Sequence, residues 1–392
     1  MQDEISEFLQ SHIDAGDFPS AVHLVAQKGV IVFHDALGLA VVEPEKIDAR
    51  LDTVYDLASL TKPLVTGLLS SLLIERGHLA PDEKISTYLK NFDTEEKKQI
   101  TIANLLTHTS GFRSWLPLYL ISNLKSEISK SIAAEPVEAA KDNKVIYSDL
   151  NFSLLKLVVE RAGGKSLSLL AAEDIFGPLK LTRTYFNPAV DLKKQIAASE
   201  KGNVYENKIC IEQGYLRSVD ISHGIDTQLS KAVTPNDIGN PQSAIRNHQI
   251  WGEVHDGNAY FMGGVAGHAG LFSTAEEVFK IALQFLPNYS QLLKPKTCEV
   301  FRTNFTEGLN EDRSFAFQLA STKDSTAGTK MSPESFGHTG FTGTSLWIDP
   351  VKDRIFVLLT NRTHNHDLPF VNINSVRRKF HDLAIELLDR KV

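Results

Sequence analysis

The chain has 392 residues, of which 42% are hydrophobic and 23% charged, the composition of a globular protein with room for a large core. Its formal net charge of −7 argues against a basic nucleic-acid-binding surface, and no apolar run reaches the roughly 18 residues of a membrane span. The two cysteines, Cys210 and Cys298, exclude a disulfide framework, a zinc finger and an iron–sulfur module.

The first residues of the chain are acidic. Asp3, Glu4 and Glu7 precede the first basic residue, Lys28. A secretory signal needs a basic start followed by an apolar run. The sequence as given therefore predicts a cytoplasmic protein, or a periplasmic or secreted one if a leader has been removed.

The N-terminal third predicts a helix, a hairpin and a second helix. Apolar residues fall on one face of an amphipathic helix over residues 4–15. Two β-rich runs flank Lys28-Gly29, which predicts a hairpin. A mostly apolar helix over residues 59–76 ends at Gly77, a C-terminal capping residue.

The middle of the chain is helical in pattern and then irregular. Thr101 is expected to cap a short helix that runs to Leu106. Residues 113–200 follow a helical pattern with a break at Gly163-Gly164. Residues 200–260 are polar and poor in β-formers, which predicts long loops near a functional site.

The C-terminal third returns to strands. Ser273-Thr-Ala-Glu276 predicts a capping box that opens a helix. Residues 335–348 and 354–361 are β-rich runs around Asp349-Pro350, which predicts a second hairpin. An amphipathic helix over residues 372–390 closes the chain.

Strands at both ends of the chain and helices between them predict an α+β fold. We expect both hairpins to share one antiparallel sheet flanked by the terminal helices. This sheet domain would be discontinuous, with residues 1–58 and 268–392. Residues 59–267 would form a mostly helical domain, with the active site between the two.

Ser59-Leu-Thr-Lys62 is the first group of residues that could carry chemistry. Serine and lysine three positions apart share a helix face, so the amine can contact the hydroxyl. The same spacing occurs at Ser122 and Ser153, inside helical patterns where it is typical of a solvated face. Ser59 instead lies at a helix start, where a partial charge of about +0.5 disfavours a protonated lysine. A simple N-cap is the alternative interpretation of Ser59.

Two further groups come later in the chain. Tyr147-Ser-Asp149 offers a tyrosine that could shuttle protons beside a cation, or that could be a core aromatic. His338-Thr-Gly340 lies in a glycine-rich β-run, where glycine often marks close approach of a ligand. A bulged edge strand is the alternative there.

The order of these three groups resembles the serine β-lactamase and penicillin-binding protein superfamily. The closer resemblance is to its class C β-lactamase, D-alanyl-D-alanine carboxypeptidase and family VIII esterase branch, which uses Tyr-x-Asn as its second element. Four other stretches are typical of that branch: Phe18-Pro-Ser-Ala-Val22, Leu105-Leu-Thr-His-Thr-Ser-Gly-Phe112, Gly267-His-Ala-Gly-Leu-Phe-Ser-Thr274 and Leu358-Leu-Thr-Asn-Arg362. The resemblance implies a β-lactamase/transpeptidase-like fold.

The resemblance also implies roles for individual residues. Ser59 would be the acylated nucleophile, with Lys62 and Tyr147 as the proton-transfer pair. The backbone N–H groups of Ser59 and Phe341 would form the oxyanion hole. The substrate-binding residues would be Asp149, His338, Thr339, Gly340, His255 and Asp256, of which His255 and Asp256 would line the cleft together with His268.

Two departures from the family pattern bear on the substrate. Asp149 stands where the family has asparagine, and a carboxylate within about 4–6 Å favours a protonated Lys62. That favours Tyr147 as the base, although the sequence is also compatible with Lys62 in that role. His338 replaces a lysine, which weakens the anchoring of a substrate carboxylate. Both changes argue against an efficient β-lactamase and, less strongly, against a carboxypeptidase.

We therefore expect a serine hydrolase that acts through an acyl-enzyme on a small ester or amide, as an esterase, D-amino-acid peptidase or β-lactamase-like enzyme. The alternatives are a muropeptide amidase of cell-wall recycling, and a penicillin-binding-type sensor or scaffold without turnover. No cofactor, metal, nucleic acid or membrane span is expected. Thr363-His-Asn-His-Asp367 has metal-like residues but no further ligand cluster, and His108 is expected to be a buried structural histidine.

Overall fold

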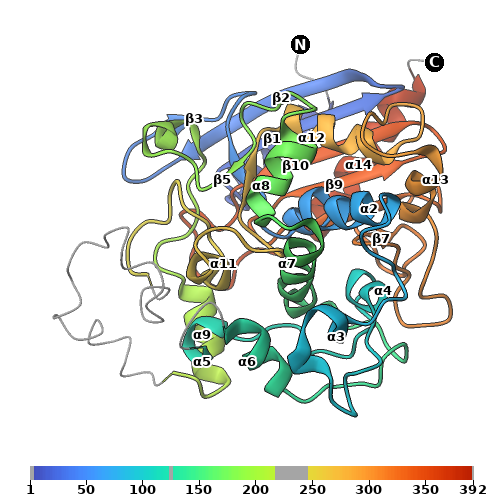
Figure 1. Ribbon diagram of the computed structural model, residues 1–392. Coiled ribbons are helices and arrows are strands. Elements are labelled where there is room, and N and C mark those ends of the chain that lie inside the picture. The colour runs from blue at the N-terminus through green and yellow to red at the C-terminus, as the bar shows by residue number, and fades with distance from the viewer. Residues whose placement is uncertain (1–3, 123–126, 217–245, 391–392) are drawn as a thin grey trace.

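The structure is a computed structural model that describes residues 4–122, 127–216 and 246–390 (Figure 1). Both described ends of the chain lie beside the large sheet, in the upper part of the view. The helices of the middle of the chain lie below the sheet. This arrangement follows from the sequence, which places its strands at the two ends and its helices between them.

A seven-stranded antiparallel sheet organises the described residues. Its strand order is β3-β2-β1-β10-β9-β8-β7. The predicted hairpins are confirmed around Lys28-Gly29 and Asp349-Pro350, and Ala21 pairs with Thr360, so that the two hairpins share one sheet. The strands are β1 (Ser20–Gln27), β2 (Val30–Val41), β3 (Ile47–Asp48), β7 (Gln318–Leu319), β8 (Phe336–Thr339), β9 (Ser345–Asp349) and β10 (Arg354–Thr360).

Both faces of this sheet are covered. The terminal helices α1 (Glu4–Asp14) and α14 (Asn374–Arg390) pack on one face, where Phe356 and Phe380 belong to one apolar cluster. Helices α2 (Leu68–Glu75) and α12 (Ala275–Ala282) contribute to the larger cluster on the other face, with Val357. Burial on both sides explains why β1 and β10 are apolar at almost every position. The prediction of an α+β fold with terminal helices on the sheet is confirmed.

The middle of the chain is less helical than its pattern predicts. Thr101 caps α4 with Asn104 in a capping box, and α7 ends at Gly164 with a φ of 69°, both as expected. Between residues 134 and 149, however, the chain is irregular, because Pro136 and the polar residues after it interrupt the apolar period. The helices are α3 (Ile85–Tyr88), α4 (Ile102–Leu106), α5 (Leu118–Ile121), α6 (Ile128–Ala134), α7 (Asp149–Gly163), α8 (Leu167–Ala171), α9 (Val204–Glu212), α11 (Gly257–Phe261) and α13 (Pro295–Cys298).

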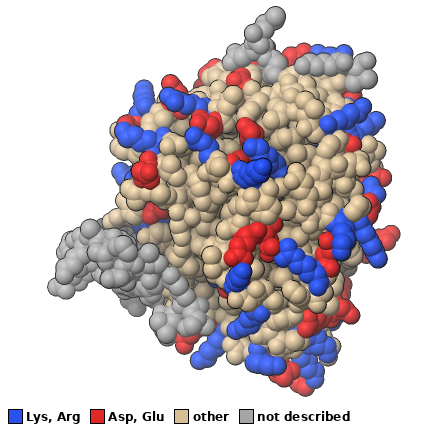
Figure 2. Space-filling model, turned by 45° about the horizontal axis from the view of Figure 1, so that its top comes forward, with Lys and Arg blue, Asp and Glu red and all other residues tan. Residues whose placement is uncertain are grey.

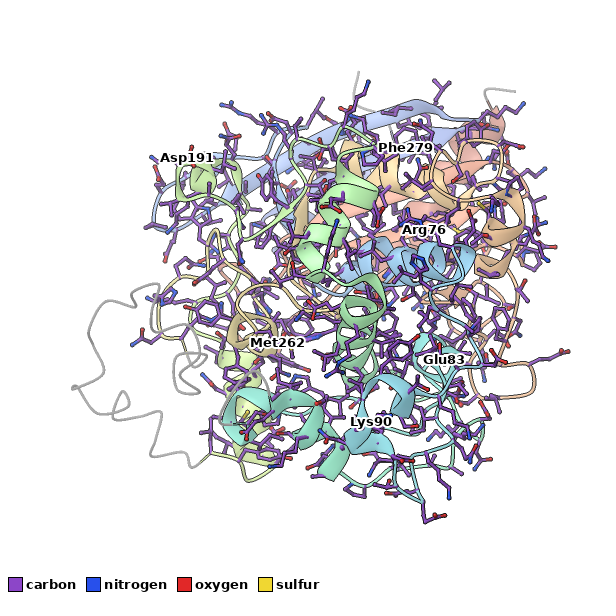
Figure 3. All side chains as sticks on the ribbon, viewed as in Figure 1. Arg76, Glu83, Lys90, Asp191, Met262 and Phe279 are labelled. Atoms are coloured by element: carbon purple, nitrogen blue, oxygen red, sulfur yellow. The ribbon has the colours of Figure 1, made fainter. Side chains whose placement is uncertain are left out.

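Shorter 3-10 and π segments complete the fold. They are η1 (Ala58–Leu60), η2 (Lys62–Gly67), η3 (Lys90–Phe92), η5 (Ala172–Phe176), η6 (Val190–Gln195), η9 (Leu283–Phe285) and η10 (Glu299–Phe301). The predicted helix over 59–76 is η1, η2 and α2 in succession, with Arg76 as its C-cap (Figure 3). Its first two turns are not regular α-helix, and they carry Ser59 and Lys62.

Three sequence predictions need correction. The N-cap of α12 is Thr274, whose hydroxyl accepts from the backbone of Glu277, one residue later than the predicted box. The run 335–348 is two strands, β8 and β9, separated by a turn over residues 340–344. The predicted loops of 200–260 contain α9 and also α11, which ends before Met262 (Figure 3), while residues 217–245 lie outside the described part.

A small three-stranded sheet lies beside the nucleophile segment. Its strands β4 (Tyr55–Asp56), β6 (Leu271–Ser273) and β5 (Tyr185–Phe186) come from distant parts of the chain. Because β4 leads directly into η1, the small sheet fixes the position of Ser59. The division into a sheet domain and a helical domain stays a prediction.

Candidate active site

Ser59 lies in the short helical turn that follows β4. The residue before it, Ala58, has a φ of 46°, a left-handed conformation that an alanine adopts only under constraint. The constraint is visible: Asp56 Oδ1 accepts from the Ala58 N–H at 2.8 Å, and Thr61 Oγ1 donates to the Ala58 carbonyl at 2.7 Å. The turn therefore holds Ser59 at one defined position in the cavity wall.

Lys62 is completely buried beside Ser59. Its Nζ donates to Ser59 Oγ at 2.8 Å and lies 2.7 Å from Asp149 Oδ1. Burial disfavours the charged amine, but Asp149 and then Tyr147 outweigh burial and raise the pKa of Lys62. Lys62 is thus a cation paired with Asp149. This charge state favours Tyr147 over Lys62 as the base, an assignment that stays a prediction.

Tyr147 completes the group around the nucleophile. Its ring lies 4.8 Å from Lys62 Nζ, and its hydroxyl interacts with Lys62 and Ser59. Burial raises the pKa of Tyr147, and Lys62 offsets this only in part. The resting side chain is therefore a neutral phenol and not a phenolate. Such a phenol can still relay a proton by accepting one while giving up its own.

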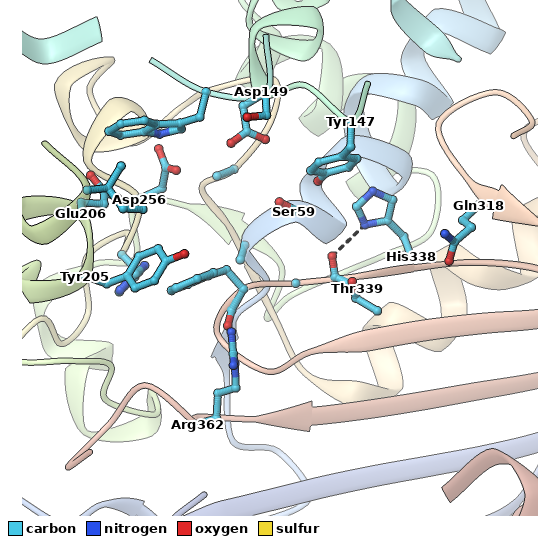
Figure 4. A pocket seen from close by; sticks show the side chains of 18 of the residues that line it. Ser59, Tyr147, Asp149, Tyr205, Glu206, Asp256, Gln318, His338, Thr339 and Arg362 are labelled. Carbon is cyan, nitrogen blue, oxygen red and sulfur yellow. Dashed lines mark hydrogen bonds between the residues drawn. The ribbon is translucent and has the colours of Figure 1, made fainter. Parts of the chain in front are cut away.

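His338 and Thr339 end strand β8, and the His338 ring lies beside Tyr147, with the ring centroids 5.7 Å apart (Figure 4). His338 Nδ1 lies 2.8 Å from the Thr339 carbonyl, a contact that fits an N–H donor at Nδ1. Burial, then Lys62 and Arg313, lower the pKa of His338 well below its ordinary value. His338 is thus neutral at pH 7 and supplies no charge for a substrate carboxylate, as the change from lysine led us to expect.

The turn after β8 is fastened to the segment before Ser59. Thr342 Oγ1 donates to the Asp56 carbonyl at 2.8 Å, and Thr344 Oγ1 donates to the Leu57 carbonyl at 3.0 Å. Within the described residues, the backbone N–H groups of Ser59 and Phe341 donate to no protein acceptor. Two free donors on tethered segments are what an oxyanion hole requires.

These residues line a cavity of about 540 Å³, a size suited to a small ligand (Figure 4). All of the sequence-predicted residues except Lys62 and His268 line it. Lys62 lies behind Ser59 in the wall, and the buried His268 pairs with Asp256 instead of lining the cavity as predicted. On the side of Asp149 lie Glu206 and Asp256, and on the side of His338 lies Gln318.

Sequence reasoning missed Arg313, which lies in the cavity wall. Only 5% of its surface is exposed, and its Nη2 pairs with Glu311 at 2.6 Å. Its Nε and Nη1 have no partner among the residues that the structure describes, and its guanidinium lies 5.3 Å from the ring of Tyr147. Arg313 stands in an irregular, glycine-poor segment with no recognisable spacing to Ser59, so no local signal pointed to it.

His255 and Asp256 reach the cavity as predicted, each already engaged in a contact. His255 Nε2 lies 2.7 Å from Glu200, which outweighs burial and raises the pKa of His255. Asp256 caps α11 and pairs with His268, and its pKa falls to about 2 although burial opposes this. Burial raises the pKa of the neighbouring Glu206 to about 7. Their role toward a substrate stays a prediction.

Three remaining expectations concern a buried histidine, a metal site and a membrane span. His108 is buried in a turn, where its Nδ1 accepts from the Ser148 N–H at 3.0 Å. The described residues contain no group of three His, Cys, Asp or Glu side chains placed to hold a metal ion, and His364 binds backbone groups instead. In the same part of the chain, no helix has the length and apolarity to cross a membrane.

Comparisons with known proteins agree over most of the chain. A family model described as Beta-lactamase matches residues 5–377. A protein of Escherichia coli (strain K12), named "Putative D-alanyl-D-alanine carboxypeptidase", is 32% identical over 391 residues, covering 92% of this chain and 82% of that protein.

Solved structures show a shared fold at lower identity. EstCE1, "a hydrolase with promiscuous acyltransferase activity", has a TM-score of 0.70 at 20% identity, covering 97% of each chain. A class C beta-lactamase from Rhodobacter sphaeroides has a TM-score of 0.66 at 17% identity, covering 98% of this chain and 99% of that one. The fold is beta-lactamase-like.

Proposed function

The chain belongs to the beta-lactamase family, a family of hydrolases, and from this premise we propose that it is a serine hydrolase that acylates Ser59 with a small ester or amide. The observation that carries the proposal is the contact set around Ser59: the buried Lys62 at 2.8 Å and Tyr147 at the same hydroxyl. A serine becomes a nucleophile when a neighbouring group takes its proton as it attacks.

In the first half of the reaction, Ser59 Oγ attacks the substrate carbonyl carbon. The serine proton passes to the Tyr147 oxygen while the phenol gives its own proton to the departing alcohol or amine. The Lys62 cation stabilises the negative charge that develops on Tyr147 during this relay. The N–H groups of Ser59 and Phe341 stabilise the charge on the carbonyl oxygen, which becomes an ester carbonyl again when the leaving group departs.

In the second half, water attacks the ester carbonyl of the acyl-enzyme. The same relay runs in reverse: Tyr147 accepts a proton from water and returns one to Ser59 Oγ as the ester bond breaks. The products are a carboxylic acid and the free enzyme. The released alcohol or amine and the acid together contain the atoms of the substrate plus one water.

The test is the intact mass of the protein after exposure to a fluorophosphonate probe. We expect one adduct on the wild type and none on Ser59→Ala. Ser122→Ala is the matched control, because Ser122 has the same spacing to a lysine but its hydroxyl donates to Ser131 away from the cavity. An adduct that persists on Ser59→Ala would show that another serine is the nucleophile, and an unmodified wild type would remove the proposal.

A D-amino-acid peptidase of the carboxypeptidase type is the second candidate. It is favoured by Arg313, whose two unpartnered N–H groups beside Tyr147 can take a substrate carboxylate that neutral His338 cannot attract. Peptides ending in D-alanine with a free carboxylate should then be cleaved faster than their C-terminal amides, and Arg313→Gln should abolish that preference. Equal rates on both peptides would favour a simple esterase.

Turnover separates these enzymes from a sensor or scaffold. An enzyme shows a burst of leaving group followed by a steady rate, whereas a sensor shows the burst alone. A muropeptide amidase would be revealed by cleavage of soluble wall peptides by the wild type but not by Ser59→Ala.

A further inference from the structure

The N–H of Phe341 and the carbonyl of Gly340 belong to one peptide group. Within the described residues the N–H donates to no protein acceptor, and Phe341 lines the cavity. The carbonyl on the other end of the group accepts from Arg377 Nη2 at 3.0 Å. The expected oxyanion donor is therefore one end of a peptide whose other end is bound by a guanidinium.

Arg377 reaches this peptide from the first turn of α14. The same Nη2 also donates to the Thr344 carbonyl at 3.0 Å, and Gly340 and Thr344 are joined by a backbone hydrogen bond of 2.7 Å. One Arg377 nitrogen thus bridges the carbonyls at the two ends of the turn over residues 340–344. That turn is the one fastened to Asp56 and Leu57 in front of Ser59.

The charge of Arg377 is not balanced by a nearby acid. Its side chain is 5% exposed, its Nη1 donates to Asn374 Oδ1 at 2.8 Å, and its Nε has no partner within the described residues. No carboxylate in that part of the chain pairs with it. Burial, and then Arg362, lower the pKa of Arg377 to about 9, so the group is still cationic at pH 7.

A buried cation bound only to neutral acceptors is unfavourable for stability, and a neutral amide could close the turn equally well. A cation that binds the carbonyl oxygen of a peptide group has an electronic effect that a neutral amide side chain lacks. It draws electron density from the carbonyl oxygen, which strengthens the N–H as a donor, since hydrogen bonds in series polarise one another. A donor fixed before the reaction stabilises a developing oxyanion without reorganisation.

A second arginine, Arg362, binds a neighbouring carbonyl of the same turn but not the one that belongs to the Gly340–Phe341 peptide. Its Nε donates to the Phe341 carbonyl at 2.8 Å. That carbonyl belongs to the following peptide group, whose N–H is that of Thr342 and not that of Phe341. Of the two arginines, only Arg377 acts on the expected oxyanion donor.

We propose that Arg377 is a positioning residue of the oxyanion hole, which orients and polarises the Gly340–Phe341 peptide so that the Phe341 N–H binds the reacting carbonyl oxygen more strongly. The inference rests on the proposed function, because it needs an acyl group on Ser59. It adds a residue from the C-terminal helix to a site otherwise built from β4, η1, η2, α7 and β8.

The test combines kinetics with the infrared spectrum of the acyl-enzyme. p-Nitrophenyl acetate with a ¹³C-labelled carbonyl is mixed rapidly with the wild type and with Arg377→Gln. Release of p-nitrophenol gives the acylation rate, and the labelled carbonyl stretch reports the strength of the hydrogen bonds to the ester oxygen. Arg378→Gln is the matched control, because Arg378 is the next residue of α14 and binds the carbonyls of Asp324 and Ser325 instead.

We expect Arg377→Gln to lower the acylation rate constant about tenfold, less than the loss of a whole oxyanion donor, with little change in apparent substrate affinity. Its carbonyl stretch should move to higher frequency, while Arg378→Gln should match the wild type in both measurements. If the carbonyl stretching frequency of Arg377→Gln matched that of the wild type, the inference would be overturned even if the acylation rate fell. A slower rate with an unchanged frequency is what a merely structural role of Arg377 predicts.

Three further outcomes also bear on the proposal. If Arg377→Gln does not fold, Asn374→Ala, which removes the anchor of Nη1 but keeps the charge, should shift the stretch in the same direction by less, and no shift would overturn the inference. A wild type that forms no acyl-enzyme would overturn the proposed function and this inference together. Acylation of the wild type with no effect of either variant would overturn the inference alone.

Discussion

The pairing of Lys62 with Asp149 sets the charge of the site. Fully buried amines tend to lose their proton, yet here a carboxylate 2.7 Å away keeps the amine charged. In the proposed function, the same carboxylate takes the place of an amide that would donate to the acylamide group of a β-lactam or peptide. We therefore propose that this one side chain influences both proton transfer and substrate recognition.

Replacing Asp149 by asparagine should change both properties. Without the carboxylate, burial lowers the pKa of Lys62 and frees the amine to act as a base, and the new amide offers an N–H donor to the substrate. We expect acylation by the β-lactam nitrocefin to become about tenfold faster in Asp149→Asn, the effect of one hydrogen bond of about 1.4 kcal/mol. Stopped-flow absorbance measures this rate.

The control for that variant is Asp191→Asn, an exposed acid far from the cavity (Figure 3). It changes the net charge by the same amount, so it should leave nitrocefin acylation at the wild-type rate. No gain in Asp149→Asn would remove the explanation of Asp149 as a barrier to amide recognition.

Residues with a fixed spacing could be predicted from the sequence, whereas residues that depend on tertiary placement could not. Ser59 and Lys62 lie one helical turn apart, and Tyr147 and His338 stand in short motifs, but only the resemblance of their order to a known family predicted that they form one site. Arg313 and Arg377 carry no such pattern. Their place in the cavity depends on how the segment before β7 and the start of α14 pack against the sheet.

At the scale of elements, the turn between β8 and β9 joins the sheet to the nucleophile. β-Propensity predicted a single run over residues 335–348, since its aromatic, threonine and aliphatic residues favour a strand in spite of its three glycines. The break arises from contacts with the segment before Ser59, which lie far away in sequence. Local propensity has no access to such contacts, whereas the paired hairpins and terminal helices follow from periodicity alone.

Gly340→Ala should disturb this junction. A Cβ at residue 340 would lie 2.0 Å from Thr344 Oγ1 and 2.6 Å from the Leu57 carbonyl, closer than atoms can approach. The turn must move away from Leu57, which separates the N–H groups of Ser59 and Phe341. We expect kcat for p-nitrophenyl acetate to fall at least about tenfold, because a displaced oxyanion donor loses much of its effect.

A lower stability of the folded protein is the competing explanation for a loss of activity in Gly340→Ala. Gly77→Ala serves as the comparison, because Gly77 has a φ of 76° that alanine tolerates poorly but no atom near the site of the new Cβ. It should cost about 1 kcal/mol of unfolding free energy and leave kcat unchanged. If Gly340→Ala lost activity only in proportion to its unfolded fraction, the turn would not position the oxyanion hole.

At the scale of the whole molecule, several buried imidazoles are neutral, although the buried Lys62 and Arg377 are charged. On the face seen in Figure 2, lysines and arginines are interspersed with acids, without one dominant basic patch. Several histidines are buried, and burial lowers the pKa of His108, His338 and His381. A sheet covered on both faces leaves little water around residues that pack between it and α14.

His381 lies on α14 against the sheet, 5.7 Å from the ring of Phe356, and its Nδ1 lies 2.9 Å from the Thr326 carbonyl. Burial lowers its pKa from 6.5 to about 3. Below pH 6.5 His381 binds a proton in the unfolded chain, whereas in the folded protein it stays neutral down to about pH 3. The free energy of unfolding therefore falls as the pH drops through this window.

We expect His381 alone to account for about 2 kcal/mol of lost unfolding free energy between pH 8 and pH 5. Urea unfolding at these two pH values gives the difference for the wild type and for His381→Gln. The variant should be less stable at pH 8 but should lose less on acidification, because glutamine binds no proton in either state. His78→Gln removes an exposed imidazole as the control. Equal losses in the wild type and His381→Gln would mean that other groups govern the acid sensitivity, and that α14 does not keep His381 neutral in the folded protein.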